Sequence, residues 1–194
     1  MAHISKMGIP VLAAIWFAVA LAGFRQLDGY SNTPAASGNA VQSWPRMSNL
    51  DPDSQKPTFV MFIHPHCPCS AASVHSLLEI MREHSLSSKF IVVFVRPKGV
   101  APKWELSATH ETCLKTPGLT TIVDDQGKEA TLFGALTSGQ TYIFSPNHEL
   151  VFSGGITSAR GMEEVGPERK LVINAILGQT AHTQHTPVFG CSLQ

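Results

Sequence analysis

The residues best suited to chemistry in this chain are two cysteines, Cys67 and Cys69, separated by one proline. They follow a short apolar and β-branched run at 58–63 and precede a segment whose apolar residues recur at helical spacing. Both thiols are therefore expected near a helix N-terminus, where unpaired backbone N–H groups and the helix dipole favour a thiolate. A thiolate is a nucleophile, so this arrangement predicts thiol-disulfide chemistry. The structural alternative is two cysteines that only shape a turn.

Three neighbours of the pair are candidate supporting residues. An imidazolium at His66 would stabilise a thiolate on the adjacent cysteine, and otherwise His66 is a solvated turn residue. His64 could instead hold the end of the preceding strand. Pro68 stiffens the loop, which is a conformational role and not a chemical one.

The chain has four cysteines, and the other two are Cys113 and Cys191. Four cysteines allow three full pairings, and sequence alone does not choose among them. A disulfide between Cys67 and Cys69 would close a small, strained ring, and strained, exposed disulfides are easily reduced. Cys113 is expected to be a small apolar residue on a helix face. Cys191 lies in a C-terminal tail that could dock and bring its sulfur beside the pair.

The same residues also permit a metal-binding or metal-delivery module. Histidine nitrogens and soft thiolates suit Cu(I) or Zn(II), and the available side chains are His64, His66, Cys67, Cys69, His182, His185 and Cys191. A third possibility is a redox-inert, anchored binding domain.

The N-terminal segment at 1–25 is predicted to be a signal peptide or membrane anchor, because residues 7–24 are uncharged and almost wholly apolar. Its Ala20-Leu21-Ala22 run resembles a cleavage site, so secretion after cleavage is the alternative to an anchored domain on the periplasmic side. The formal net charge is zero, so nucleic acid is not an expected partner. We find no P-loop, Gly-x-Gly-x-x-Gly or Ser-His-Asp pattern, and expect no cofactor.

The rest of the chain divides into a polar linker at 26–57, a domain at 58–178 and a tail at 179–194. Alternating apolar patterns predict strands at 58–63, 90–95, 119–123, 140–144 and 150–152, with helices at 69–85, 103–115, 128–135 and 168–177. This order predicts an α/β domain with a mixed sheet flanked by helices: mostly parallel strands with a late antiparallel hairpin.

This pattern resembles the thioredoxin-like superfamily. Those proteins have a strand that ends in an aromatic residue, a short turn, and a Cys-x-x-Cys opening the helix, and here Phe62 precedes Cys67 by the same interval. The resemblance implies that Cys67 is the attacking cysteine and that its partners are protein thiols or disulfides. The second family cysteine falls at Ser70, whereas this chain has Cys69. We therefore expect Cys69 to resolve the mixed disulfide, with Cys191 or an external thiol as the alternative.

More narrowly, residues 45–194 are similar to bacterial membrane-anchored thioredoxin-like proteins described as RedB-like. The similarity covers four motifs: His64-Pro65-His66-Cys67-Pro68-Cys69, Thr137-Ser138-Gly139-Gln140, Gly154-Gly155-Ile156-Thr157 with Arg160-Gly161, and Thr186-Pro187-Val188-Phe189-Gly190-Cys191. It implies that Gly139 takes the place, before a late strand, where thioredoxins have a cis-proline facing the cysteines.

Overall fold

The structure, a computed structural model, describes residues 8–163 and 166–193. It divides into two compact units, Met1–Thr33 and Pro34–Gln194. Residues 1–7 of the predicted signal or anchor and residue 194 of the predicted tail lie outside the described residues.

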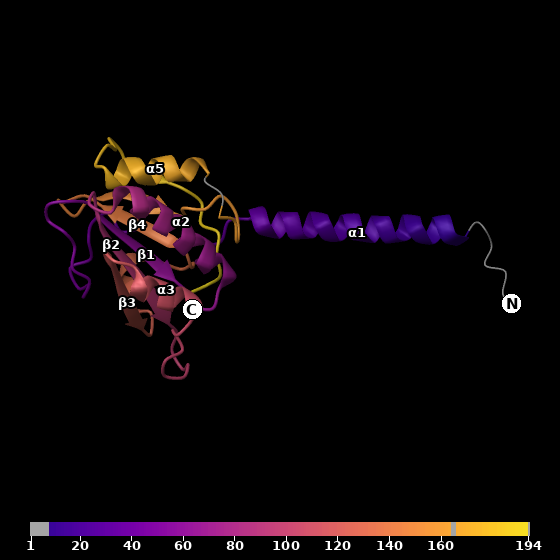
Figure 1. The fold of residues 1–194 in the computed structure, drawn as a ribbon, viewed down its shortest axis with the longest axis horizontal. Helices are drawn as coiled ribbons and strands as arrows, with labels where there is room; N and C mark the ends of the chain where they lie inside the picture. Colours follow the sequence, from indigo (N-terminus) through magenta and orange to yellow (C-terminus); the bar gives the residue numbers. More distant parts are fainter. Residues whose placement is uncertain (1–7, 164–165, 194) are drawn as a thin grey trace. The chain divides into compact units, whose positions relative to one another are not determined.

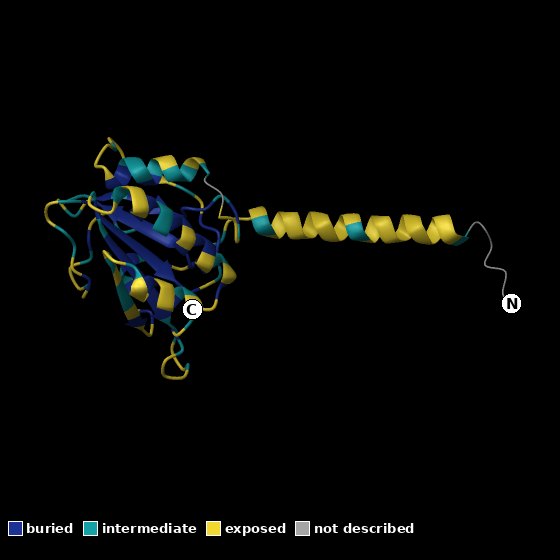
Figure 2. Ribbon diagram, viewed as in Figure 1, coloured by how far each residue is buried: buried dark blue, intermediate teal, exposed yellow. Residues whose placement is uncertain are grey.

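The first unit contains one helix, α1 (Gly8–Asn32), whose side chains are almost all exposed (Figure 1, Figure 2). Its most apolar window has a mean hydropathy of 1.8, and it is the one helix among the described residues that is long and apolar enough to cross a membrane. A bilayer core of about 30 Å needs about 20 such residues. The helix fits the predicted signal or anchor, and it continues seven residues beyond the predicted end at residue 25.

The second unit is built on a six-stranded mixed sheet with the order β3-β2-β1-β4-β5-β6 (Figure 1). Central strand β1 pairs in parallel with β2 and antiparallel with β4. Strands β2 and β3 are parallel, β4 and β5 form the antiparallel hairpin, and β6 pairs in parallel with β5. The strands are β1 (Thr58–Ile63), β2 (Lys89–Arg96), β3 (Leu119–Asp125), β4 (Gln140–Phe144), β5 (Leu150–Gly154) and β6 (Gln184–His185).

Four helices join these strands: α2 (Pro68–His84), α3 (Ala108–Lys115), α4 (Lys128–Phe133) and α5 (Pro167–Ile176). Helix α2 begins abruptly because Pro68 fits the first helical turn, where its missing N–H costs no hydrogen bond. Helix α3 starts five residues later than predicted. Lys103 has a positive φ, and Ser107 caps the helix by accepting a hydrogen bond from the His110 backbone.

Alternate residues of the central strands face opposite sides of the sheet, and both sides are buried (Figure 2). Phe59, Met61 and Ile63 of β1 pack beneath α2, α3 and α5. Val60 and Phe62 pack on the other side with α4. A sheet covered on both faces explains the continuous apolar runs of β1 and β2, and the α/β class with a mixed sheet is as predicted.

The second face is completed by segments from both ends of this unit. Trp44 packs edge-on against Phe133 and Phe144, and Leu50 belongs to the same cluster. Leu193, near the C-terminus, is fully buried there. Residues within the predicted linker and tail therefore contribute to the core, and these two segments hold the site described next.

Candidate functional site

Cys67 lies between β1 and α2, at the N-cap position of the helix. Its backbone is extended, with φ −91° and ψ 124°, so the thiol belongs to the turn while its carbonyl accepts a hydrogen bond from the Ser70 N–H at 3.0 Å. Cys69 lies in the first turn of α2 and is half-buried. Both cysteines thus occupy the position predicted from the sequence. Cys67 is only 5% exposed.

The sulfur of Cys191 contacts the sulfur of Cys67, with 2.7 Å between the two Sγ atoms. The two residues are 124 positions apart in the sequence, so the contact depends on how the C-terminal tail folds back. Val188 and Phe189, just before Cys191, are buried. The tail is therefore part of the site.

Backbone hydrogen bonds fix the tail on both sides of Cys191. The Ser138 N–H donates to the Cys191 carbonyl at 2.8 Å, and the Leu193 N–H donates to the Leu136 carbonyl at 2.9 Å. Thr137 and Ser192 form an isolated antiparallel bridge between these bonds. The tail thus lies like a short extra strand along the loop that precedes β4.

Three further contacts hold the tail before Cys191. The Ala35 N–H donates to the Val188 carbonyl at 2.8 Å, and the Gly155 N–H donates to the Pro187 carbonyl at 3.1 Å. The Arg160 guanidinium donates to the Gly190 carbonyl. A side chain at position 190 would overlap the Ser138 carbonyl, so glycine is needed for this close approach.

The hydrogen bonds at the site favour a thiolate on Cys67. Burial alone would raise the pKa of this thiol, but hydrogen bonds from the Cys191 thiol and from the Cys191, Ser70 and Cys69 backbones outweigh it and hold the pKa below its ordinary value. Burial raises the pKa of Cys191 to about 12, reinforced by its hydrogen bond to Cys67 and by the charge there. Of the two thiols, Cys67 is therefore the one that ionises first, and Cys191 keeps its proton more strongly.

The other two cysteines differ in their surroundings. Burial, the charge on Cys67 and a hydrogen bond to the Cys67 thiol raise the pKa of Cys69, while the positive charge of Arg160 opposes this rise. Cys113 is fully buried in the core, and burial raises its pKa to about 12. Cys113 thus has the environment of the apolar core residue predicted from the sequence.

A buried pair of serines joins the turn to the loop before β4. Ser138 Oγ accepts a hydrogen bond from the His64 N–H at 2.8 Å and lies 2.6 Å from Ser70 Oγ. Ser70 Oγ donates to the His64 carbonyl at 2.7 Å. Gly139 follows in this loop with φ +88°, and its N–H donates to the Phe62 carbonyl. Gly139 thus directly precedes β4 beside the turn, in the place expected from the resemblance.

The two predicted supporting histidines face a tryptophan. The rings of His64 and His66 pack edge-on against Trp104, with centroids 4.9 and 4.8 Å away. His66 Nε2 lies 2.7 Å from the Trp104 carbonyl oxygen. Burial, and then the charge of His66, lower the pKa of His64, so this ring is neutral at neutral pH. These histidines therefore join the loop before α3 to the cysteine turn.

The structure brings together Cys67, Cys69, Cys191, His64, His66, Pro68 and Gly139, all of which were predicted as site residues. Sequence reasoning assigned no role to Ser138 or Arg160, although both lie within motifs that carried the family resemblance. It also missed Trp104, because this residue fell inside the helix predicted at 103–115 and was interpreted as part of that helix. In the described ranges, no three His, Cys, Asp or Glu side chains form a group arranged to hold a metal ion.

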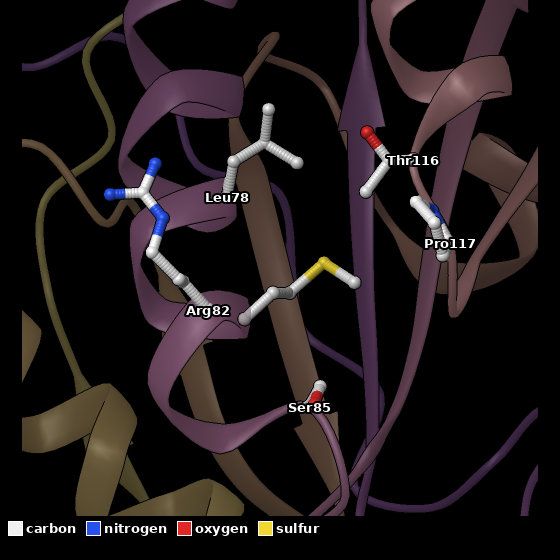
Figure 3. Close-up of a pocket in the computed structure, with 6 residues that line it drawn as sticks. Leu78, Arg82, Ser85, Thr116 and Pro117 are labelled. Carbon is white, nitrogen blue, oxygen red and sulfur yellow. The ribbon is translucent and has the colours of Figure 1, made fainter.

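A cavity of about 350 Å³ lies elsewhere, between α2 and the turn that follows α3 (Figure 3). Its lining residues are Leu78, Met81, Arg82, Ser85, Thr116 and Pro117. No cysteine or histidine is among them, so this cavity is not part of the thiol site.

No protein-family model and no curated protein matches this sequence. Solved structures do match it. A hypothetical protein from Sinorhizobium meliloti is 17% identical with a TM-score of 0.60, and the match covers 84% of this chain and 96% of that one. An uncharacterized conserved protein from Geobacillus kaustophilus is 18% identical with a TM-score of 0.60, covering 84% of this chain and 91% of that one.

A thioredoxin-like protein solved in its oxidized form is 14% identical with a TM-score of 0.48, covering 77% of this chain and 97% of that one. At these identities the likenesses concern the fold and not the activity. Cys67 and Cys69 lie at the start of α2, the helix that follows the central strand β1. The predicted α/β fold, a mixed sheet flanked by helices, is confirmed.

Proposed function

We propose that this chain, whose fold is thioredoxin-like, is an exported, membrane-anchored thiol-disulfide oxidoreductase that acts on protein thiols or disulfides through Cys67. The observation that supports the proposal most strongly is the position of the Cys67 sulfur and the lowered pKa of its thiol. Cys67 lies at the N-terminus of α2 and shares a hydrogen bond with the Cys191 thiol, and its pKa is lowered despite burial. A buried thiol without such donors would be inert.

The first step follows from this arrangement. The Cys67 thiolate attacks one sulfur of a substrate disulfide, forms a mixed disulfide, and releases the other substrate sulfur as a thiolate. A second thiol of the protein then attacks the Cys67 sulfur and releases the substrate. Cys69 and Cys191 are the two candidates for this second step, because both thiols lie next to Cys67.

The proposed location rests on α1. This helix is long and apolar enough to span a bilayer, and Arg25 follows its most apolar part. An anchor of this kind would hold the cysteines on the periplasmic side, where disulfides persist. Secretion after cleavage of the N-terminal segment is the alternative, and the RedB-like assignment stays a prediction from sequence motifs.

The test is reduction of insulin by the full chain in detergent, with dithiothreitol as the electron source. We expect turbidity to rise faster with the chain than with dithiothreitol alone, and expect Cys67→Ser to abolish the difference. Cys113→Ala is the matched control, because it also removes a buried cysteine but lies in α3 within the core cluster, and not in the cysteine turn.

Equal turbidity with the chain and with Cys67→Ser would contradict the proposal. Metal analysis of the same preparation adds a second outcome. Stoichiometric copper or zinc that is lost in Cys67→Ser would favour the metal-delivery function in its place.

A further inference from the structure

We propose that Cys191, carried by the docked C-terminal tail, is the thiol that resolves the mixed disulfide on Cys67. This inference rests on the proposed function and specifies its second step. It assigns the redox couple to Cys67 and Cys191 and leaves Cys69 outside it.

Geometry favours Cys191 over Cys69. The Cys191 sulfur already contacts the Cys67 sulfur at 2.7 Å. The Cys69 thiol also lies near Cys67, and a hydrogen bond to Cys67 helps to raise its pKa. A Cys67–Cys69 bond would close a small, strained ring across one intervening residue, whereas Cys191 approaches from a separate segment.

The tail is held in a way that aims its sulfur. Hydrogen bonds on both sides of Cys191 tie the backbone to Ser138 and to Leu136, and Leu193 is buried in the second core cluster. Gly190 makes a close approach to Ser138 that a side chain would prevent. These contacts fix the position of Cys191, which lies outside the helices and strands of the domain.

The proposed step balances as follows. The Cys67 thiolate attacks the substrate disulfide, and the departing substrate thiolate takes the proton from the Cys191 thiol. The resulting Cys191 thiolate attacks the Cys67 sulfur, the Cys67–Cys191 bond forms, and the second substrate sulfur leaves as a thiolate. The substrate disulfide is reduced by two electrons and the two cysteines are oxidised. A protein or small-molecule dithiol must then reduce the new bond.

The charge next to Cys191 changes between the two reaction steps, and this change favours ionisation of Cys191 before the second step. While Cys67 is ionised, its charge helps to hold Cys191 protonated. The mixed disulfide removes that charge, and the positive charge of Arg160 remains to favour a Cys191 thiolate. Cys191 thus becomes a better nucleophile at the point where it is needed.

The docked tail places Cys191 against a sulfur that is only 5% exposed. The resolving thiol is therefore already at the site before a substrate disulfide arrives.

The experiment uses the full chain in detergent, fully reduced and mixed with one equivalent of an aromatic disulfide that releases a coloured thiolate. Proteolysis and mass spectrometry measure the fraction of Cys67 that carries the mixed disulfide. We expect Cys191→Ser to raise this fraction roughly tenfold or more, because the second step is lost. Cys69→Ser and the buried control Cys113→Ala should behave as the unaltered chain.

Gly190→Ala is a second variant that keeps every thiol. It should lengthen the life of the mixed disulfide, because the added methyl group overlaps the Ser138 carbonyl and disturbs docking. Gly29→Ala is its control, since a methyl group there meets no atom within 4 Å.

Loss of the mixed disulfide at the unaltered rate in Cys191→Ser would overturn the inference, and so would its accumulation in Cys69→Ser alone. Absence of any mixed disulfide on Cys67 in all variants would instead overturn the proposed function. The two failures are therefore distinguishable.

Discussion

Cys67 and Cys191 contact each other through their sulfur atoms, although one is the N-cap residue of α2 and the other lies 124 positions later in the sequence. The contact joins an ionisable sulfur to a protonated one. It explains how a buried cysteine can keep a lowered pKa, because the neighbouring thiol supplies a hydrogen bond that water would otherwise supply.

The pH dependence of Cys67 alkylation is the first prediction. Since the pKa of Cys67 is lowered, the iodoacetamide rate should reach half its maximum at a pH below 9.0, the ordinary pKa of a thiol. Cys191→Ala removes the donor thiol and should move this midpoint to higher pH. The measurement is peptide mass analysis of Cys67 across a pH series. An unchanged midpoint in Cys191→Ala, with Cys113→Ala as control, would contradict the prediction.

Cys113 should be almost unreactive in the folded chain. It is fully buried, and burial raises its pKa to about 12. Alkylation then requires unfolding, so we expect a rate roughly a thousandfold or more below that of Cys67 under native conditions. Mass analysis of both peptides after timed exposure to iodoacetamide checks this. Comparable rates for the two cysteines before denaturant is added would refute it.

Ser138→Ala should destabilise the second unit. Its hydroxyl accepts the His64 N–H, and without it this N–H and the Ser70 hydroxyl lose a partner. The expected loss in free energy of unfolding is about 1–3 kcal/mol. Urea denaturation followed by circular dichroism measures it, with exposed Ser54→Ala as the matched control. A loss no larger than that of the control would show that this serine pair does not hold the loop.

Glu129→Ala should release the segment at 48–50 from the domain. The buried Glu129 carboxylate accepts hydrogen bonds from Ser48 Oγ at 2.6 Å and from the Asn49 N–H at 2.9 Å. Loss of these bonds should lower the free energy of unfolding by about 1–3 kcal/mol. Urea denaturation followed by circular dichroism measures this loss. Exposed Glu149→Ala is the control. Equal unfolding curves for the two variants would mean that the segment contributes little to stability.

Local patterns were sufficient to predict much of this fold. Strands β1 and β4 have the predicted bounds, because apolar and β-branched runs end at clear turn residues. The start of α2 was predicted within one residue, since Pro68 can open a helix but cannot continue a strand. The position of Cys67 follows from these two elements.

The remaining features depend on contacts that no local pattern encodes. Strand β6 is only two residues long and pairs with β5 about thirty positions earlier. Trp44 and Leu193 come from opposite ends of the second unit and meet the same face of the sheet. Sequence reasoning treated Cys191 as one option, because only the folded tail shows that its sulfur reaches Cys67.

The most direct test of this account is a redox titration of the full chain against dithiothreitol buffers, with disulfide mapping by mass spectrometry at each step. We predict one reversible two-electron transition in which Cys67 and Cys191 become linked, while Cys69 and Cys113 stay reduced. A Cys67 thiol that remains reduced under every oxidising condition would show that this sulfur does not exchange disulfides.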